Sequence, residues 1–66
     1  MTPAEIFELI VKADEKLKYS NEANADLRRR QAIDLLVQAR GEAERAGQAQ
    51  LAEQARTRLA DLGAAP

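Results

Sequence analysis

Apolar residues recur at every third or fourth position along much of the chain, which is the spacing of one face of an α-helix. In residues 3–18 this stripe comprises Ile6, Ile10, Ala13 and Leu17. Thr2 is suited to cap the first turn, Pro3 to occupy the first helical position, and Glu5 to complete a capping box. The pattern therefore predicts a helix over residues 3–18.

Two further stripes predict a second helix over residues 22–46 and a third over residues 48–62. The inward-facing residues are expected to be Ala25, Ala32, Ile33, Leu36, Ala39 and Ala43 in the second helix, and Leu51, Ala52, Ala55, Leu59 and Leu62 in the third. Gly47 and Gly63 stand where helices commonly end in a left-handed glycine. The second helix has three alternative N-cap residues, namely Ser20, Asn21 and Asn24.

No stretch of the sequence alternates polar and apolar residues in the manner of a strand. The predicted fold class is therefore all-α, either a small bundle of three antiparallel helices or a helical hairpin with a third helix docked on it. Residues 1–66 are expected to form a single helical domain with a frayed tail at residues 63–66. Asp14 and Lys18, four residues apart, are expected to pair on the surface of the first helix.

The hairpin predicted over residues 33–62 resembles a tetratricopeptide repeat, in which apolar and small residues recur at fixed spacings around a turn that contains glycine. The residues that carry the resemblance are Leu36, Ala39, Ala43, Gly47, Ala52 and Leu59. Arg40 and Arg56 depart from it, because the family has a small residue and an aromatic residue at these places, and Pro66 comes two residues late. Since stacked repeats need neighbours, the resemblance implies that the first helix or another copy of the chain covers the hairpin. The chain resembles more weakly the three-helix microtubule-interacting-and-trafficking module, which binds peptide helices.

The composition excludes several classes of protein. The 66 residues contain neither Cys nor His, which excludes disulfide scaffolds, iron–sulfur clusters and the usual zinc, haem and copper sites. The longest run of large apolar residues is Leu9-Ile10-Val11, too short to span a membrane, and the N-terminus lacks the pattern of a secretory signal. A cytoplasmic protein is expected.

The side chains offer little for catalysis. Thr2 and Ser20 are explained as helix caps, and no two carboxylates share a helix face at the spacing of an acid–base pair. The glycines are isolated, so no glycine-rich loop is available to bind phosphate. We expect no enzyme activity, no catalytic residue, no cofactor and no metal.

Four apolar residues lie outside the predicted core stripes and are candidates for an interaction surface. Phe7 and Val11 form a second apolar edge on the first helix, and Leu27 and Val37 project among polar residues of the second. The alternative interpretation is that the bundle itself covers them. We expect a helical protein–protein interaction module that associates with itself or docks a helical segment of another protein.

The run of Arg28, Arg29 and Arg30 suggests an alternative function, in which an arginine-rich helix, together with Arg40, binds nucleic acid or an acidic partner. Two features weaken this alternative. Three successive helical residues fan over roughly 200° instead of forming one face. Residues 1–26 carry three Lys against six acidic residues, a charge of −3 that repels phosphates, although the whole chain has a charge of only −1.

Overall fold

Three helices make up the computed structural model, which describes residues 1–64. They are α1 (Pro3–Lys18), α2 (Ala25–Arg45) and α3 (Ala49–Asp61), and the described residues contain no strand. The all-α prediction and the number of helices are confirmed. The predicted frayed tail extends to residues 65–66, which lie outside the described residues.

α1 begins where the capping box was predicted. The Thr2 hydroxyl accepts a hydrogen bond from the Glu5 backbone N–H at 3.2 Å, and the Glu5 carboxylate accepts one from the Thr2 backbone N–H at 2.9 Å. These bonds satisfy two donors that the start of a helix otherwise leaves unpaired. They also fix the position at which the chain enters α1.

The capping box makes the start of α1 sensitive to acid. The backbone N–H of Thr2, followed by its hydroxyl, holds the pKa of the Glu5 carboxyl below its ordinary value of 4.5. Because the pKa is lower in the folded chain than in the unfolded one, the cap stabilises above the unfolded pKa and is lost as pH falls through the folded pKa. We expect the Thr2→Ala variant to raise the pKa of Glu5, as measured by NMR titration of its side-chain carbonyl carbon. Because the backbone N–H remains in this variant, the rise measures the part that the hydroxyl contributes, and an unchanged pKa would contradict that contribution.

Of the three alternative N-caps, Asn24 takes the N-cap position, so α2 begins at Ala25, three residues after the predicted bound and after an asparagine turn. The Asn21 side chain accepts hydrogen bonds from the backbone N–H groups of Ala23 and Asn24 at 2.9 and 3.1 Å. The Asn24 side chain accepts from the backbone N–H of Asn21 at 2.7 Å and makes no capping bond to α2. The asparagines therefore stabilise the loop, and Ala25, predicted to face inward, is exposed.

Both later helices end at the predicted glycines. Gly47, with φ of 69°, follows α2, and Gly63, with φ of 70°, follows α3. The backbone N–H of Gln48 reaches back to the carbonyl of Ala43 at 2.8 Å, which closes a Schellman motif. A side chain would be strained in this left-handed conformation, so glycine ends each helix at a defined residue. Gly41, in contrast, lies within an uninterrupted α2.

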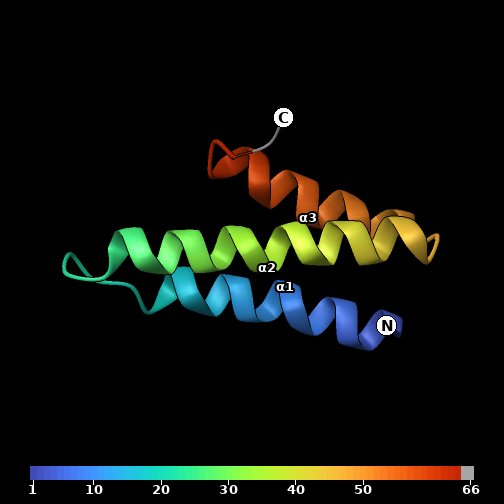
Figure 1. Cartoon of the computed structure of the whole chain (residues 1–66), viewed down its shortest axis with the longest axis horizontal. Coiled ribbons are helices and arrows are strands. Elements are labelled where there is room, and N and C mark those ends of the chain that lie inside the picture. The colour runs from blue at the N-terminus through green and yellow to red at the C-terminus, as the bar shows by residue number, and fades with distance from the viewer. Residues whose placement is uncertain (65–66) are drawn as a thin grey trace.

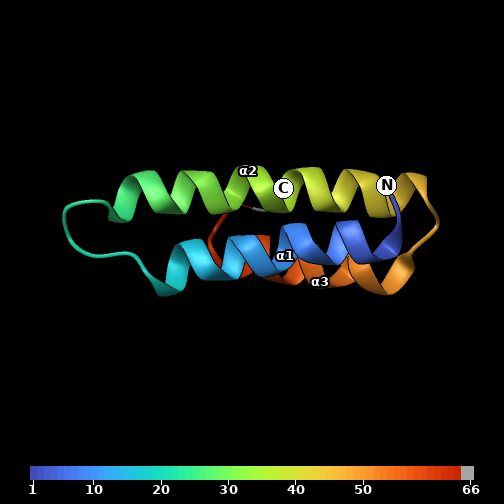
Figure 2. The same cartoon turned by 90° about the horizontal axis from the view of Figure 1, so that it is seen from below.

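α2 is the central helix of a flat bundle. α1 and α3 pack along its two sides and run parallel to each other (Figure 1), and a view from below places both on the same side of α2 (Figure 2). α1 and α3 touch each other far less than each touches α2. The Cα atoms span 38 × 23 × 13 Å. Each helix therefore keeps a large part of its surface uncovered.

The core is built largely from alanine. Its buried residues are Ile6, Leu9, Ile10, Ala13, Ala32, Leu36, Ala39, Ala43, Ala52, Ala55 and Leu59. On the buried face of α2 only Leu36 is large, and the other three residues are Ala. Small side chains on facing stripes allow helix axes to approach closely. Leu9 and most of the predicted stripes of α1 and α3 supply the rest of the core. The predicted inward residues Leu17, Ile33, Leu51 and Leu62 are only half-buried and pack against its edge.

Candidate functional site

A salt bridge fixes how α1 and α3 lie alongside each other. The Arg58 guanidinium contacts the Asp14 carboxylate through its Nε at 3.0 Å and through its Nη2 at 3.1 Å. The predicted pairing of Asp14 with Lys18 is therefore wrong, because the fold brings a guanidinium with two parallel donors to the same carboxylate. Both side chains are partly exposed, so we expect the pair to define register more than to stabilise the fold.

A short row of apolar residues runs along α1 on the side of this salt bridge. Ala4, Phe7 and Val11 follow one another by three and four positions, so they share a face of α1. The Phe7 side chain is 48% exposed, and Val11 is half-buried. The bundle therefore leaves about half of Phe7 uncovered and covers Val11 more fully. We call Ala4, Phe7 and Val11 the α1 apolar row.

α3 places a further apolar residue beside this row. Phe7 precedes Asp14 by seven residues, and Leu51 precedes Arg58 by the same interval. Seven residues are close to two helical turns, so each apolar residue lies on the same side of its helix as the salt-bridge residue. Leu51 is half-buried and packs against the core. Phe7 and Leu51 thus lie at corresponding levels along the boundary between α1 and α3.

The two apolar candidates on α2 are not part of the α1 apolar row. Leu27 and Val37 are 52% and 44% exposed. Ten residues separate them, which is about 15 Å along a helix and about 80° around its axis. α1 and α2 run in opposite directions (Figure 1). Leu27 at the start of α2 and Phe7 near the start of α1 therefore lie at opposite ends of the bundle. Leu27 and Val37 are isolated exposed residues, which are common on protein surfaces.

The three consecutive arginines have three different surroundings. Arg28 is half-buried beside α1 and lines a surface pocket. The Arg29 guanidinium donates a hydrogen bond to the backbone carbonyl of Leu62, just after α3. Arg30 is exposed. The fold does not bring the arginine side chains together, so they do not form one basic face.

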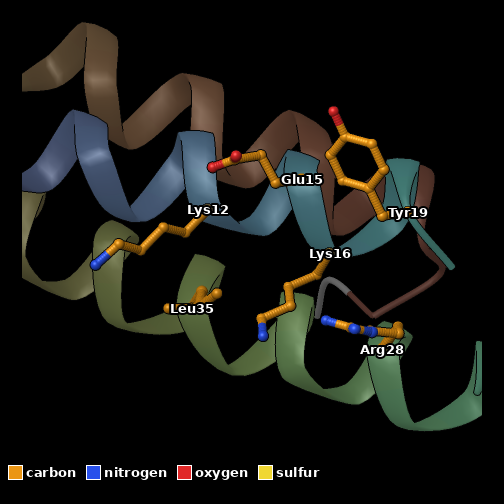
Figure 3. Close-up of a pocket in the computed structure, with 6 residues that line it drawn as sticks. All are labelled: Lys12, Glu15, Lys16, Tyr19, Arg28 and Leu35. Atoms are coloured by element: carbon orange, nitrogen blue, oxygen red, sulfur yellow. The ribbon is translucent and has the colours of Figure 1, made fainter.

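The pocket that Arg28 lines lies between α1 and α2, and the sequence interpretation did not identify it. Its volume is about 420 Å³, and its lining residues are Lys12, Glu15, Lys16, Tyr19, Arg28 and Leu35. Lys12 and Lys16 extend from α1 toward α2, whereas the Glu15 carboxylate and the Tyr19 hydroxyl point the other way (Figure 3). The i,i+4 spacing of the two lysines was the visible signal. The sequence carries no comparable signal for Arg28, because it reaches the pocket only through the way in which α1 and α2 pack.

A metal site and a membrane span are both missing from residues 1–64. No three acidic side chains among them gather closely enough to hold a metal ion. No helix in that part of the chain combines the length and the apolar composition that crossing a membrane requires.

No protein-family model, no curated protein and no solved structure matches the chain. The candidate surfaces therefore depend on the geometry of this chain alone.

Proposed function

We propose that this chain is a non-enzymatic helical interaction module that binds a second copy of itself through the α1 apolar row. The observation that carries the proposal is the exposure of Phe7, the largest apolar side chain of α1, between Ala4 and Val11. Spacings of three and four residues are those of positions that face a partner helix in coiled-coil packing. A second α1 in the opposite direction would present the same row, as a two-fold symmetric interface requires.

The second form of the proposal is docking of a helical segment of another protein. The resemblance of residues 33–62 to a tetratricopeptide repeat implies that a neighbouring helix covers this hairpin, and α1, which packs on α2, already takes that place. The large and small residues that carry the resemblance, such as Leu36 and Ala52, are buried in the core that the three helices share. Arg56 is exposed where the repeat has an aromatic residue. A foreign helix would use the same row on α1.

Replacing Phe7 with Glu is expected to weaken self-association strongly. Fully burying a phenylalanine side chain contributes about 1.5–3 kcal/mol; Phe7 is already half covered, so a dimer gains about half of this from each of its two copies. We therefore expect the dissociation constant of the dimer to rise at least about tenfold. Sedimentation equilibrium across a wide range of protein concentration measures this constant. Circular dichroism checks that α1 still folds.

The matched control is Leu27→Glu, which introduces the same charge at an exposed leucine outside the α1 apolar row. We expect this variant to dimerise like the unmodified chain. Equal weakening by the two substitutions would contradict the assignment of the interface to α1. A chain that stays monomeric at millimolar concentration would contradict self-association.

A further inference from the structure

The pocket between α1 and α2 gathers three cations that form no ion pair with any residue from 1 to 64. Lys12 and Lys16 extend toward α2, and the Arg28 guanidinium points back toward Lys16 (Figure 3). The ion pairs found within residues 1–64 involve the N-terminal amine and other arginines. Glu15 is the only acidic residue of the lining, and its carboxylate is turned away. The pocket therefore concentrates positive charge.

The placement of Arg28 is not explained by helix stabilisation. It lies at the start of α2, where the N-terminal end of the helix dipole is positive and a cation is unfavourable. The two lysines across the pocket add to this repulsion, since like charges close together raise the free energy of both. An anion bound among the three cations would attract each of them and so offset their mutual repulsion. The arrangement thus favours an anionic ligand.

We propose that the Lys12–Lys16–Arg28 pocket binds a phosphate group, carried by a small organic molecule. A phosphate monoester has a charge of about −1.5 to −2 near neutral pH, so it balances three cations better than a single carboxylate does. The guanidinium of Arg28 offers two parallel donors that match phosphate oxygens, and the lysines supply point charges.

The size and lining of the pocket indicate what carries the phosphate. A volume of about 420 Å³ lies in the range of sites for small organic ligands and exceeds what a phosphate group fills. Leu35 and the methylene stems of the lysines offer an apolar lining to the remainder of such a molecule. The ligand class that fits is a phosphate ester with a small apolar body.

The pocket is separate from the α1 apolar row. Lys16 follows Phe7 by nine residues, which is half a turn out of phase on a helix, so the two lie on opposite sides of α1. A variant of the pocket is therefore expected to leave self-association unchanged. Failure of one proposal leaves the other intact.

NMR titration of ¹⁵N-labelled full-length chain with phenyl phosphate and, separately, with inorganic phosphate tests the proposal. The titration is run near pH 7.5, where the ester is mostly a dianion, and sodium chloride keeps the ionic strength constant. We expect saturable shifts of the Lys16, Tyr19 and Arg28 amides. The amides of Gly47 and Gln48, which line a second pocket at the α2–α3 turn, are expected to stay unchanged.

Charge variants identify the residues that bind the ligand. Lys16→Gln and Arg28→Gln are each expected to weaken phenyl phosphate at least about tenfold, whereas Lys16→Arg retains binding because it keeps the charge. Lys18→Gln removes the same charge from a neighbouring lysine outside the pocket and is expected to have a small effect. Circular dichroism establishes that each variant folds.

The outcomes separate the sources of the phosphate. If phenyl phosphate binds more tightly than inorganic phosphate, the ligand is an organic ester. If the two compounds bind equally, the pocket is a site for free phosphate. Shifts that do not saturate, or that sodium chloride reproduces, would overturn the phosphate site. Equal losses in the Lys18→Gln and Lys16→Gln variants would also overturn it, because the effect would then follow net charge alone.

Discussion

Replacing Leu36 with Ala is expected to remove a large part of the stability of the fold. Leu36 is fully buried and is the only large residue on the buried face of α2. A buried Leu→Ala substitution costs about 2–5 kcal/mol, because the surroundings collapse only partly into the cavity. A domain of this length has a total free energy of unfolding of about 3–10 kcal/mol. The variant should therefore lose a large fraction of its free energy of unfolding.

Urea denaturation followed by circular dichroism at 222 nm measures the loss. At about 4–8 °C per kcal/mol, the melting temperature should fall by about 10 °C or more. Leu27→Ala is the matched control, since Leu27 is a half-exposed leucine of the same helix. We expect the control to change the free energy of unfolding by less than about 0.5 kcal/mol. Similar losses at the two positions would contradict the burial described for Leu36.

Replacing Ala39 with Leu is expected to destabilise the fold although the new residue is more hydrophobic. Ala39 is fully buried on α2, in a core that small side chains keep thin. Added methylene groups in a packed core force side chains out of their rotamers or push helices apart, at a cost of about 1–3 kcal/mol. The small alanine side chain at this position thus sets how closely α2 packs against its neighbours.

Ala60→Leu provides the comparison for Ala39→Leu, because Ala60 is exposed on α3 and both residues are good helix formers. Urea denaturation is expected to show little change for Ala60→Leu. An Ala39→Leu variant as stable as the unmodified chain would mean that the core has unused space. Its midpoint of unfolding would then match that of Ala60→Leu.

The periodic and capping signals of this sequence were sufficient to predict the helices. The stripe through Ile6 and Ile10 and the capping box of Thr2 and Glu5 are local, so they are visible without tertiary information. The start of α2 stayed open among three N-cap residues, because Asn21 and Asn24 can satisfy backbone donors of either a helix or a loop. Local sequence does not decide between these two uses.

The contacts between helices could not be predicted in the same way. Asp14 meets Arg58 across 44 positions, and Lys16 meets Arg28 only because α1 and α2 pack with a particular rotation. A helical wheel gives the direction of each side chain on its own helix but not the register of two helices. The sequence left open whether Phe7 is exposed or covered by the bundle. It is about half exposed because α3 covers little of α1.

The central position of α2 also bears on how fast the chain folds. Nearly all contacts between helices join α1 to α2 or α2 to α3, which are neighbours in the sequence. Such contacts close only short loops, and helical proteins with this property fold within microseconds to milliseconds. The salt bridge from Asp14 to Arg58 instead joins residues 44 positions apart, so the loop that it closes costs more conformational entropy than either hairpin.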